Sequence, residues 1–209
     1  MKTRSPLTLT VLLCTLALAG CGGLLTSKQP ARQYYLLQPL NAAGGGFEGG
    51  QNTVLRLGLD VIPGLDTDRI LALDPDARLA SYANARWPDH LPEVLSSVLR
   101  RSLESTGRFA RVETGGRGAD GDWVLDLELR GFYGIRDGAG STGSVRVALA
   151  GSLACGSETH RLDLADGAPV AEERLAAIVA AHQAALDSVT RDLVEQLANR
   201  CRDHPDPAP

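Results

Sequence analysis

The stretch WVLDLELRGFY, residues 123–133, decides the fold class because apolar and polar side chains alternate along it. A period of two residues is typical of a strand that buries one face. The Gly-rich stretch 137–141 follows, and a second alternating run occupies residues 145–153. Two such runs joined by a turn predict a long antiparallel hairpin. The side chains predicted to line its buried face are Trp123, Leu125, Leu127, Leu129, Tyr133, Val145, Val147, Leu149 and Leu153.

Further strands are predicted on both sides of this hairpin. Residues 54–62 alternate in the same way and end at Pro63-Gly64, where proline removes a ladder donor and glycine favours a turn. Shorter strands are predicted around residues 34–38, 69–73, 77–82, 109–112 and 159–164.

Two segments show helical spacing of their apolar residues. In residues 88–107, Asp89 can cap the helix and Gly107 can end it. A longer helix is predicted over residues 172–200, on the order of 40 Å at 1.5 Å per residue, with His182 on its apolar stripe. The chain is therefore predicted to be α+β, with a mainly antiparallel sheet and two principal amphipathic helices packed on one face.

The N-terminus has the features of an export signal. Lys2 and Arg4 precede an uncharged stretch, residues 7–19, which is too short for the roughly 20 residues of a membrane-spanning helix. Leu18-Ala19-Gly20-Cys21 matches a lipobox, which predicts cleavage before Cys21 and its acylation by a diacylglycerol and an N-acyl chain. The alternative is ordinary secretory cleavage near Ala19 with a chance cysteine.

The remainder is predicted to be a lipid-anchored protein of the cell envelope that faces the periplasm. Gly22 stands where an Asp commonly retains lipoproteins in the inner membrane, which favours the outer membrane. Residues 21–33 are expected to be a flexible tether, residues 34–202 one domain with a mobile Gly-rich loop at 41–51, and residues 203–209 a disordered tail.

The charge of the mature chain argues against nucleic acid as a partner. Loss of Lys2 and Arg4 leaves 19 basic and 25 acidic residues, a formal charge of −6. No basic stripe is available to neutralise phosphates.

The four cysteines divide into three groups. Cys14 leaves with the signal peptide and Cys21 carries lipid, so Cys155 and Cys201 remain. In an oxidising periplasm these two form either a disulfide, with Cα atoms within about 7 Å, or two buried thiols. Neither belongs to a CxxC pair, which argues against a redox or zinc role.

The sequence carries no recognisable enzyme or metal motif. Gly115 to Gly118 is interpreted as loop, and Asp66, Asp68, Asp74 and Asp76 lack the spacing of a calcium loop. His182 is predicted to be a hydrogen-bonded core residue, and His90 beside Asp89 a surface group. We therefore expect no catalytic residues, no metal and no cofactor other than the acyl groups on Cys21.

Three aromatic residues are candidates for contact with a partner. Trp87 lies just ahead of the first predicted helix, and Tyr34 and Tyr35 lie next to the tether. Each can serve either to pack an element end against the sheet or to form part of a contact surface.

A series of short motifs lies along the mature chain. They are the lipobox at Cys21, Tyr34-Tyr35 with Leu37, residues 61–66 (VIPGLD) leading to Ile70, Tyr82, Ala85-Arg86-Trp87, Gly107 with Phe109, residues 125–132 (LDLELRGF), and the Ala-rich residues 180–186. Over residues 21–200 this series resembles the ABC-type transport auxiliary lipoprotein family, a PqiC-like group. The Gly-rich insertion at 44–50 and the pair Cys155 and Cys201 are not features of that family, so neither inherits a role.

The resemblance implies an accessory subunit of an MCE-type ABC transport system that moves phospholipid or other apolar molecules between the inner and outer membranes. Its implied partners are an MCE-domain protein with its permease and ATPase, and self-assembly into a ring stays open. Two rival functions remain. A lipid-binding carrier or outer-membrane assembly lipoprotein would need its own apolar cavity, and a periplasmic hydrolase would need a polar cleft.

Overall fold

The computed structural model describes residues 31–41, 53–115 and 122–201. The predictions for the signal peptide, for Cys21, for almost all of the Gly-rich loop and for the tail lie outside the described residues. No helix in the described ranges is both long enough and apolar enough to span a bilayer.

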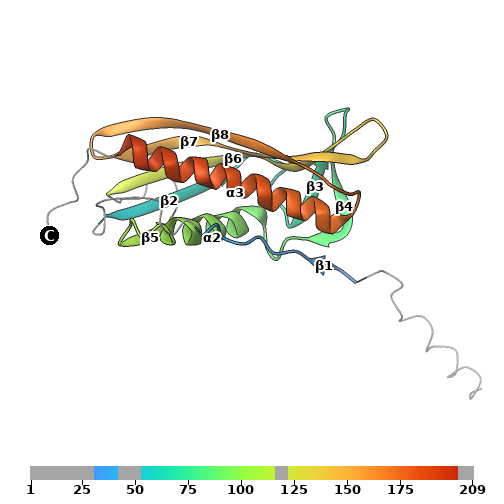
Figure 1. Cartoon of the computed structure of the whole chain (residues 1–209), viewed down its shortest axis with the longest axis horizontal. Helices are drawn as coiled ribbons and strands as arrows, with labels where there is room; N and C mark the ends of the chain where they lie inside the picture. Colours follow the sequence, from blue (N-terminus) through green and yellow to red (C-terminus); the bar gives the residue numbers. More distant parts are fainter. Residues whose placement is uncertain (1–30, 42–52, 116–121, 202–209) are drawn as a thin grey trace, which may run out of the picture. The chain divides into compact units, whose positions relative to one another are not determined.

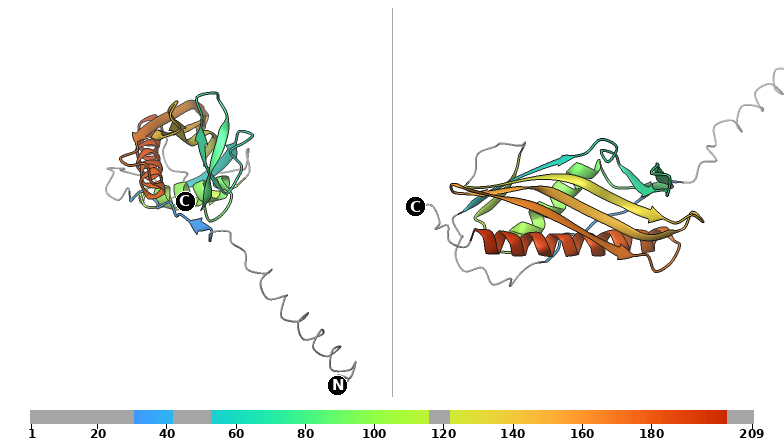
Figure 2. Two further views of the ribbon diagram at one scale, coloured as in Figure 1. Left: turned by 90° about the vertical axis from the view of Figure 1, so that its right-hand side faces the viewer. Right: turned by 90° about the horizontal axis from the view of Figure 1, so that it is seen from above.

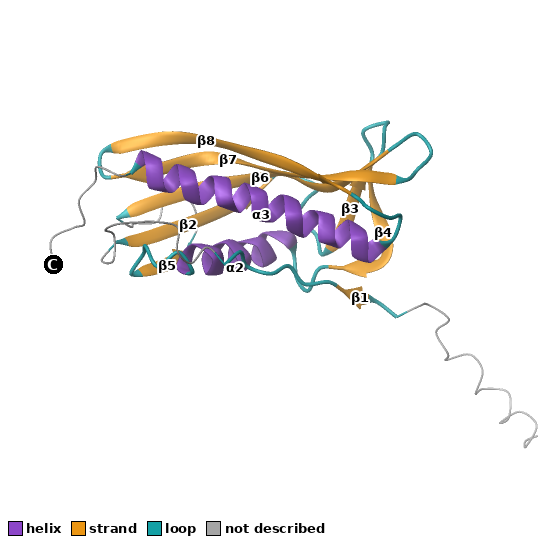
Figure 3. Cartoon of the chain, viewed as in Figure 1, coloured by secondary structure: helices purple, strands orange, loops and turns teal. Residues whose placement is uncertain are grey.

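The described ranges form eight strands and two helices (Figures 1 and 3). In chain order these are β1 (Gln33–Tyr34), β2 (Val54–Val61), β3 (Arg69–Leu73), β4 (Leu79–Arg86), α2 (Leu91–Glu104), β5 (Arg111–Thr114), β6 (Trp123–Arg136), β7 (Thr142–Cys155), β8 (Glu158–Pro169) and α3 (Leu175–Arg200).

The predicted hairpin is present and is the longest feature of the sheet. β6 and β7 pair antiparallel from Trp123 opposite Cys155 to Arg136 opposite Thr142. β8 continues the meander, antiparallel to β7 along its whole length. Its connections are short, as expected when consecutive strands run antiparallel.

The prediction of a mainly antiparallel sheet is wrong. On its other side β6 pairs parallel with β2 and, further along, with β3. The pairs β1–β4 and β2–β5 are parallel as well, so four of the seven strand pairings in the described chain are parallel and the sheet is mixed. Alternation reveals which face of a strand is buried, but the direction of its neighbour depends on the connection, and the long connection from β2 to β6 permits a parallel pair.

The buried face of β6 changes partway along the strand. A register shift between Leu129 and Gly131 places Phe132, which is 1% exposed, in the core. Tyr133 is only partly buried, so its predicted place in the buried row is wrong. The extra residue of a β-bulge moves every later side chain to the opposite face.

The two helices lie together on one side of the curved sheet (Figure 2), and the apolar core fills the space between them. α2 packs against β2 and β5, and α3 packs against β6, β7 and β8. The carboxylate of Asp89 accepts the N–H of His90 instead of capping the helix, which begins at Leu91. Gly107 follows the end of α2 with φ +68°, the left-handed conformation expected of a glycine stop.

A disulfide connects the end of β7 to the end of α3. Cys155 and Cys201 are joined with their Cα atoms 6.0 Å apart, and both residues are fully buried. The covalent link holds the last turn of α3 against the hairpin.

Candidate docking surface

Trp87 lies in the core and not on a contact surface. Its side chain is 1% exposed. Its ring packs edge-to-face with those of Phe132 and His182, with centroids 5.6 and 5.8 Å away. Its backbone N–H donates to the carbonyl of Asp68 at 2.7 Å. The partner-contact alternative for Trp87 is therefore wrong, because a partner could reach it only by opening the core. It packs the entry to α2 against the sheet.

The two tyrosines beside the tether differ in exposure. Tyr35 is partly buried, and its N–H donates to the carbonyl of Arg86 at 2.9 Å. Tyr34 is 58% exposed, at the edge of the sheet beside β4. Of the three predicted contact residues, Tyr34 offers the most accessible side chain.

His182 and His90 occupy the kinds of place predicted for them. The Nδ1 of His182 donates to the carbonyl of Ile178 at 2.9 Å, and burial lowers the pKa of this imidazole to about 4. His90 lies on the surface, 2.8 Å from Asp66, whose hydrogen bond raises the pKa of His90. No group of three or more residues able to hold a metal ion occurs in the part of the chain that the structure describes.

A row of side chains in register crosses five strands on the outer face of the sheet. Pro169 of β8 is opposite Ser144 of β7, which is opposite Ile135 of β6. Ile135 is opposite Leu73 of β3, and Leu73 is opposite Leu79 of β4. We call these five residues the outer row.

The outer row is mostly apolar and reaches solvent. Leu79 is 40% exposed and Ile135 is 38% exposed, Pro169 is exposed, and Leu73 is partly buried. One residue further along the same sheet, the next row faces the interior. It consists of Val145 of β7, Gly134 of β6 and Ala72 of β3. Because successive side chains of a strand point to opposite faces, the outer row points away from the core.

A hollow of about 340 Å³ adjoins the outer row. Ile135, Ser144 and Pro169 of the row line it, together with Arg146 and the backbone of Gly167. Gly167 is opposite Arg146 in the register, and a Cβ at Gly167 would lie 2.8 Å from the carbonyl oxygen of Val145. Asp166 lines the hollow as well, so its apolar residues lie beside one basic and one acidic side chain, both exposed. Such a mixed surface suits contact with another protein.

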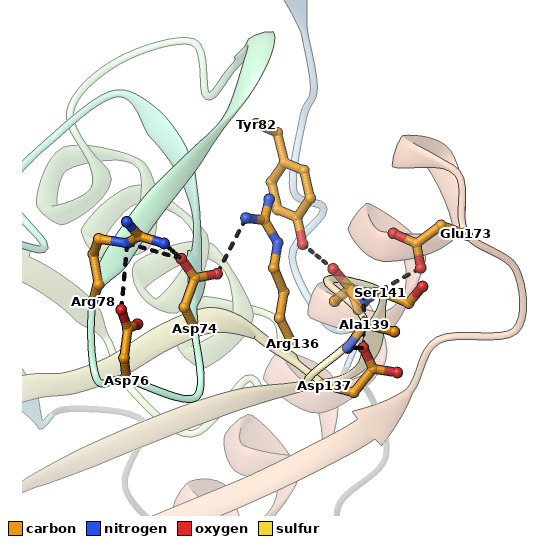
Figure 4. A network of polar contacts seen from close by, with 10 residues as sticks. Asp74, Asp76, Arg78, Tyr82, Arg136, Asp137, Ala139, Ser141 and Glu173 are labelled. Atoms are coloured by element: carbon orange, nitrogen blue, oxygen red, sulfur yellow. Dashed lines mark hydrogen bonds and ion pairs between the residues drawn. The ribbon is translucent and has the colours of Figure 1, made fainter.

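A network of polar contacts holds the elements that carry the outer row (Figure 4). Asp74, at the turn between β3 and β4, pairs with Arg78 at 2.9 Å and with Arg136 of β6 at 3.2 Å. The hydrogen bond from Arg78, assisted by Arg136, holds the pKa of Asp74 below its usual range. The two neighbouring hairpins are therefore joined by charged groups directly beside Leu73 and Leu79.

The same network continues toward α3. The guanidinium of Arg136 lies over the ring of Tyr82, 5.0 Å from its centroid, and the Tyr82 hydroxyl is hydrogen bonded to that of Thr142. The backbone N–H of Thr142 donates to Glu173 at 2.9 Å, just before α3. Burial raises the pKa of Tyr82, so its hydroxyl stays protonated at neutral pH. The hairpins β3–β4 and β6–β7 and the approach to α3 are thus fixed relative to one another.

A second hollow, of about 410 Å³, lies between α2 and the ends of β2 and β5. Leu57 and Leu59 form its floor, and Ser96, Ser97 and Arg100 of α2 its side. Both hollows open to solvent, and neither is an enclosed apolar chamber of the kind that buries most of a lipid.

Sequence reasoning missed the outer row. Leu73 and Leu79 flank the predicted turn at residues 74–76, and Ile135 continues the alternation of Tyr133. Nothing in the sequence placed them side by side, because their alignment depends on the parallel pairing of β3 with β6. The bulge near Gly131 also turns Ile135 outward.

Comparison with known proteins agrees with this architecture. The fold matches protein XCC0632 from Xanthomonas campestris, assigned to the family DUF330, with a TM-score of 0.64 and 20% identity over 78% of this chain and 94% of that one. It also matches a structure described as an uncharacterized protein, with a TM-score of 0.62 and 14% identity over 80% of this chain and 99% of that one. No curated protein matches the chain.

The family itself follows from the sequence. Residues 35–194 match the family described as the ABC-type transport auxiliary lipoprotein component. The chain belongs to this family of accessory components of ABC-type transport systems. The resemblance inferred from the motifs is therefore confirmed.

Proposed function

We propose that the protein is a non-enzymatic accessory subunit of an MCE-type ABC transport system, anchored by acyl chains on Cys21 to the periplasmic face of the outer membrane. It holds the periplasmic part of a system that moves phospholipid or other apolar molecules between the two membranes. The family supports an accessory role in ABC transport, and the lipobox at Cys21 supports the anchor.

The observation that carries the proposal is the outer row. Contiguous apolar side chains on a protein surface are a common feature of protein interaction sites, and the ion pairs of Asp74 hold the hairpins that carry this row. Leu79, Ile135 and Pro169 supply apolar contact, and Arg146 at the rim supplies charge. We infer that the MCE-domain protein docks on this row.

The test is in-cell crosslinking and purification of the acylated protein, followed by mass spectrometry of proteins and lipids. The variant carries Leu79→Asp and Ile135→Asp, which place charge on the outer row. The matched control is Thr159→Asp, at an exposed position at the start of β8. The wild type and the control should recover an MCE-domain protein with its permease and ATPase, and the variant should lose most of that recovery.

Two outcomes would count against the proposal. Equal recovery from variant and control would remove the outer row as the docking surface. Recovery of stoichiometric lipid from the wild type, without the transport proteins, would favour the carrier function instead.

A further inference from the structure

The chain enters the domain with two apolar side chains turned to solvent. Residues 34–37 are Tyr-Tyr-Leu-Leu, and in extended backbone they alternate between two directions. Leu37 is 4% exposed and Tyr35 is partly buried, whereas Tyr34 is 58% and Leu36 is 64% exposed. Only the side of the segment that carries Tyr35 and Leu37 packs against the core.

The exposed side is held on a fixed backbone. Next to Leu36, the N–H of Tyr35 donates to Arg86 at 2.9 Å. Gln183 of α3 binds both the N–H and the carbonyl of Gln38, at 2.8 and 3.0 Å. The N–H of Leu40 then donates to Ser102 of α2 at 2.9 Å. The segment is therefore bound to both helices, and the backbone that carries Tyr34 and Leu36 is held between β4 and α3. Figure 1 shows it running from β1 alongside α2.

The distance to the predicted anchor along the chain is short. Cys21 precedes Tyr34 by 13 residues, which reach at most about 45 Å when fully extended. An acylated Cys21 would therefore keep the membrane surface permanently within reach of Tyr34 and Leu36.

We propose that Tyr34 and Leu36 form a membrane-contact strip, which enters the headgroup and upper acyl region of the bilayer that holds Cys21. The inference rests on the lipid anchor of the proposed function. Tyrosine suits this depth because its ring is apolar and its hydroxyl can stay hydrated. Arg32, which is exposed beside the strip, can pair with anionic phosphate groups.

A bilayer fits the strip better than a protein does. Two side chains cannot supply the roughly 800 Å² per partner of a stable protein interface. With a covalent anchor the strip does not need to provide affinity. It needs only to orient the domain, which a few apolar contacts can do when the local concentration of membrane is high.

The test places a tryptophan in the strip of the full acylated chain. Leu36→Trp is compared with Thr159→Trp, whose site lies at the other end of the domain, where β8 begins (Figure 1). Trp87 and Trp123, which are buried, give both variants the same background. Each variant is reconstituted in phosphatidylethanolamine and phosphatidylglycerol vesicles with or without brominated acyl chains.

The expected result is blue-shifted emission and several-fold greater quenching for Leu36→Trp than for Thr159→Trp. Equal quenching of the two variants would contradict the proposal that the strip enters the bilayer. The intact mass of each protein separates this failure from a failure of the anchor. A mature chain without acyl groups would refute the anchor itself, whereas an acylated chain with an unquenched Leu36→Trp would refute only the strip.

Discussion

At the scale of single residues, the buried imidazole of His182 has the clearest consequence. Nδ1 donates to the carbonyl of Ile178, and Nε2 is buried with no hydrogen-bond partner in the described chain. The imidazole packs against the rings of Trp87 and Phe132. Protonation would place a new N–H and a positive charge among these rings without an acceptor. The neutral form is therefore the one that the fold stabilises.

Stability should fall with acidification in a window set by this histidine. In the folded protein the pKa of His182 is lowered to about 4 from its ordinary value of 6.5, so the unfolded chain binds more protons below pH 6.5. The loss begins there and is nearly complete at pH 4, and at pH 4.5 it amounts to roughly 2–3 kcal/mol of the free energy of unfolding. Urea unfolding should give a lower free energy of unfolding at pH 4.5 than at pH 7 in the wild type and in the control variant His160→Gln. In His182→Gln the difference should be much smaller; an unchanged difference would contradict this assignment.

Gly151 makes the closest backbone approach in the β6–β7 hairpin. A Cβ at this position would lie 1.9 Å from the carbonyl oxygen of Asp126, a backbone atom that cannot turn aside. Gly151→Ala should therefore cost about 2 kcal/mol or more in the free energy of unfolding. Gly143→Ala, on the same strand with no atom within 4 Å, should stay within about 0.5 kcal/mol of the wild type. Similar values for both variants would show that the two strands can separate without strain.

At the scale of elements, the disulfide determines how firmly α3 is held. It closes a loop between residues 46 apart, for which chain entropy predicts about 4 kcal/mol of stabilisation. The double variant Cys155→Ala and Cys201→Ala should have a clearly lower melting temperature than the wild type. Reductant should lower the melting temperature of the wild type and leave that of the double variant unchanged. A wild type that is insensitive to reductant would mean that the bond contributes little.

At the scale of the whole molecule, what the sequence could predict depended on local periodicity. The β6–β7 hairpin and both helices were predicted, because alternation and helical spacing are visible within one segment. The parallel pairings of β6 with β2 and β3 were not, because they join segments far apart in the chain. The outer row was missed for the same reason, since Ile135 and Leu79 become neighbours only through β3.

For the candidate contact residues too, the local sequence predicted only part of what the structure shows. Composition and position identified Trp87 and Tyr34 as unusual, but no local pattern distinguishes a buried tryptophan at a helix entry from an exposed one. The aromatic contacts of Trp87 with Phe132 and His182 join the connection before α2 to β6 and α3. Leu36 was not singled out, because two adjacent leucines in a short predicted strand do not show which of them faces the core.

The position of β6 between its neighbours also has a kinetic consequence. One of its edges pairs with β7, its nearest neighbour in the chain, and the other with β2, where Val54 and Asp122 bond across 68 residues. Local pairs form first, because long-range pairs must offset the entropy of closing a large loop. We expect the β6–β7–β8 meander to form early in the refolding chain and β2 to pair with β6 later. Pulse-labelled hydrogen exchange would then show earlier protection of the meander than of β2. During that interval the edge of β6 that pairs with β2 and β3 in the folded protein is open, and an open strand edge can pair with another chain and start aggregation.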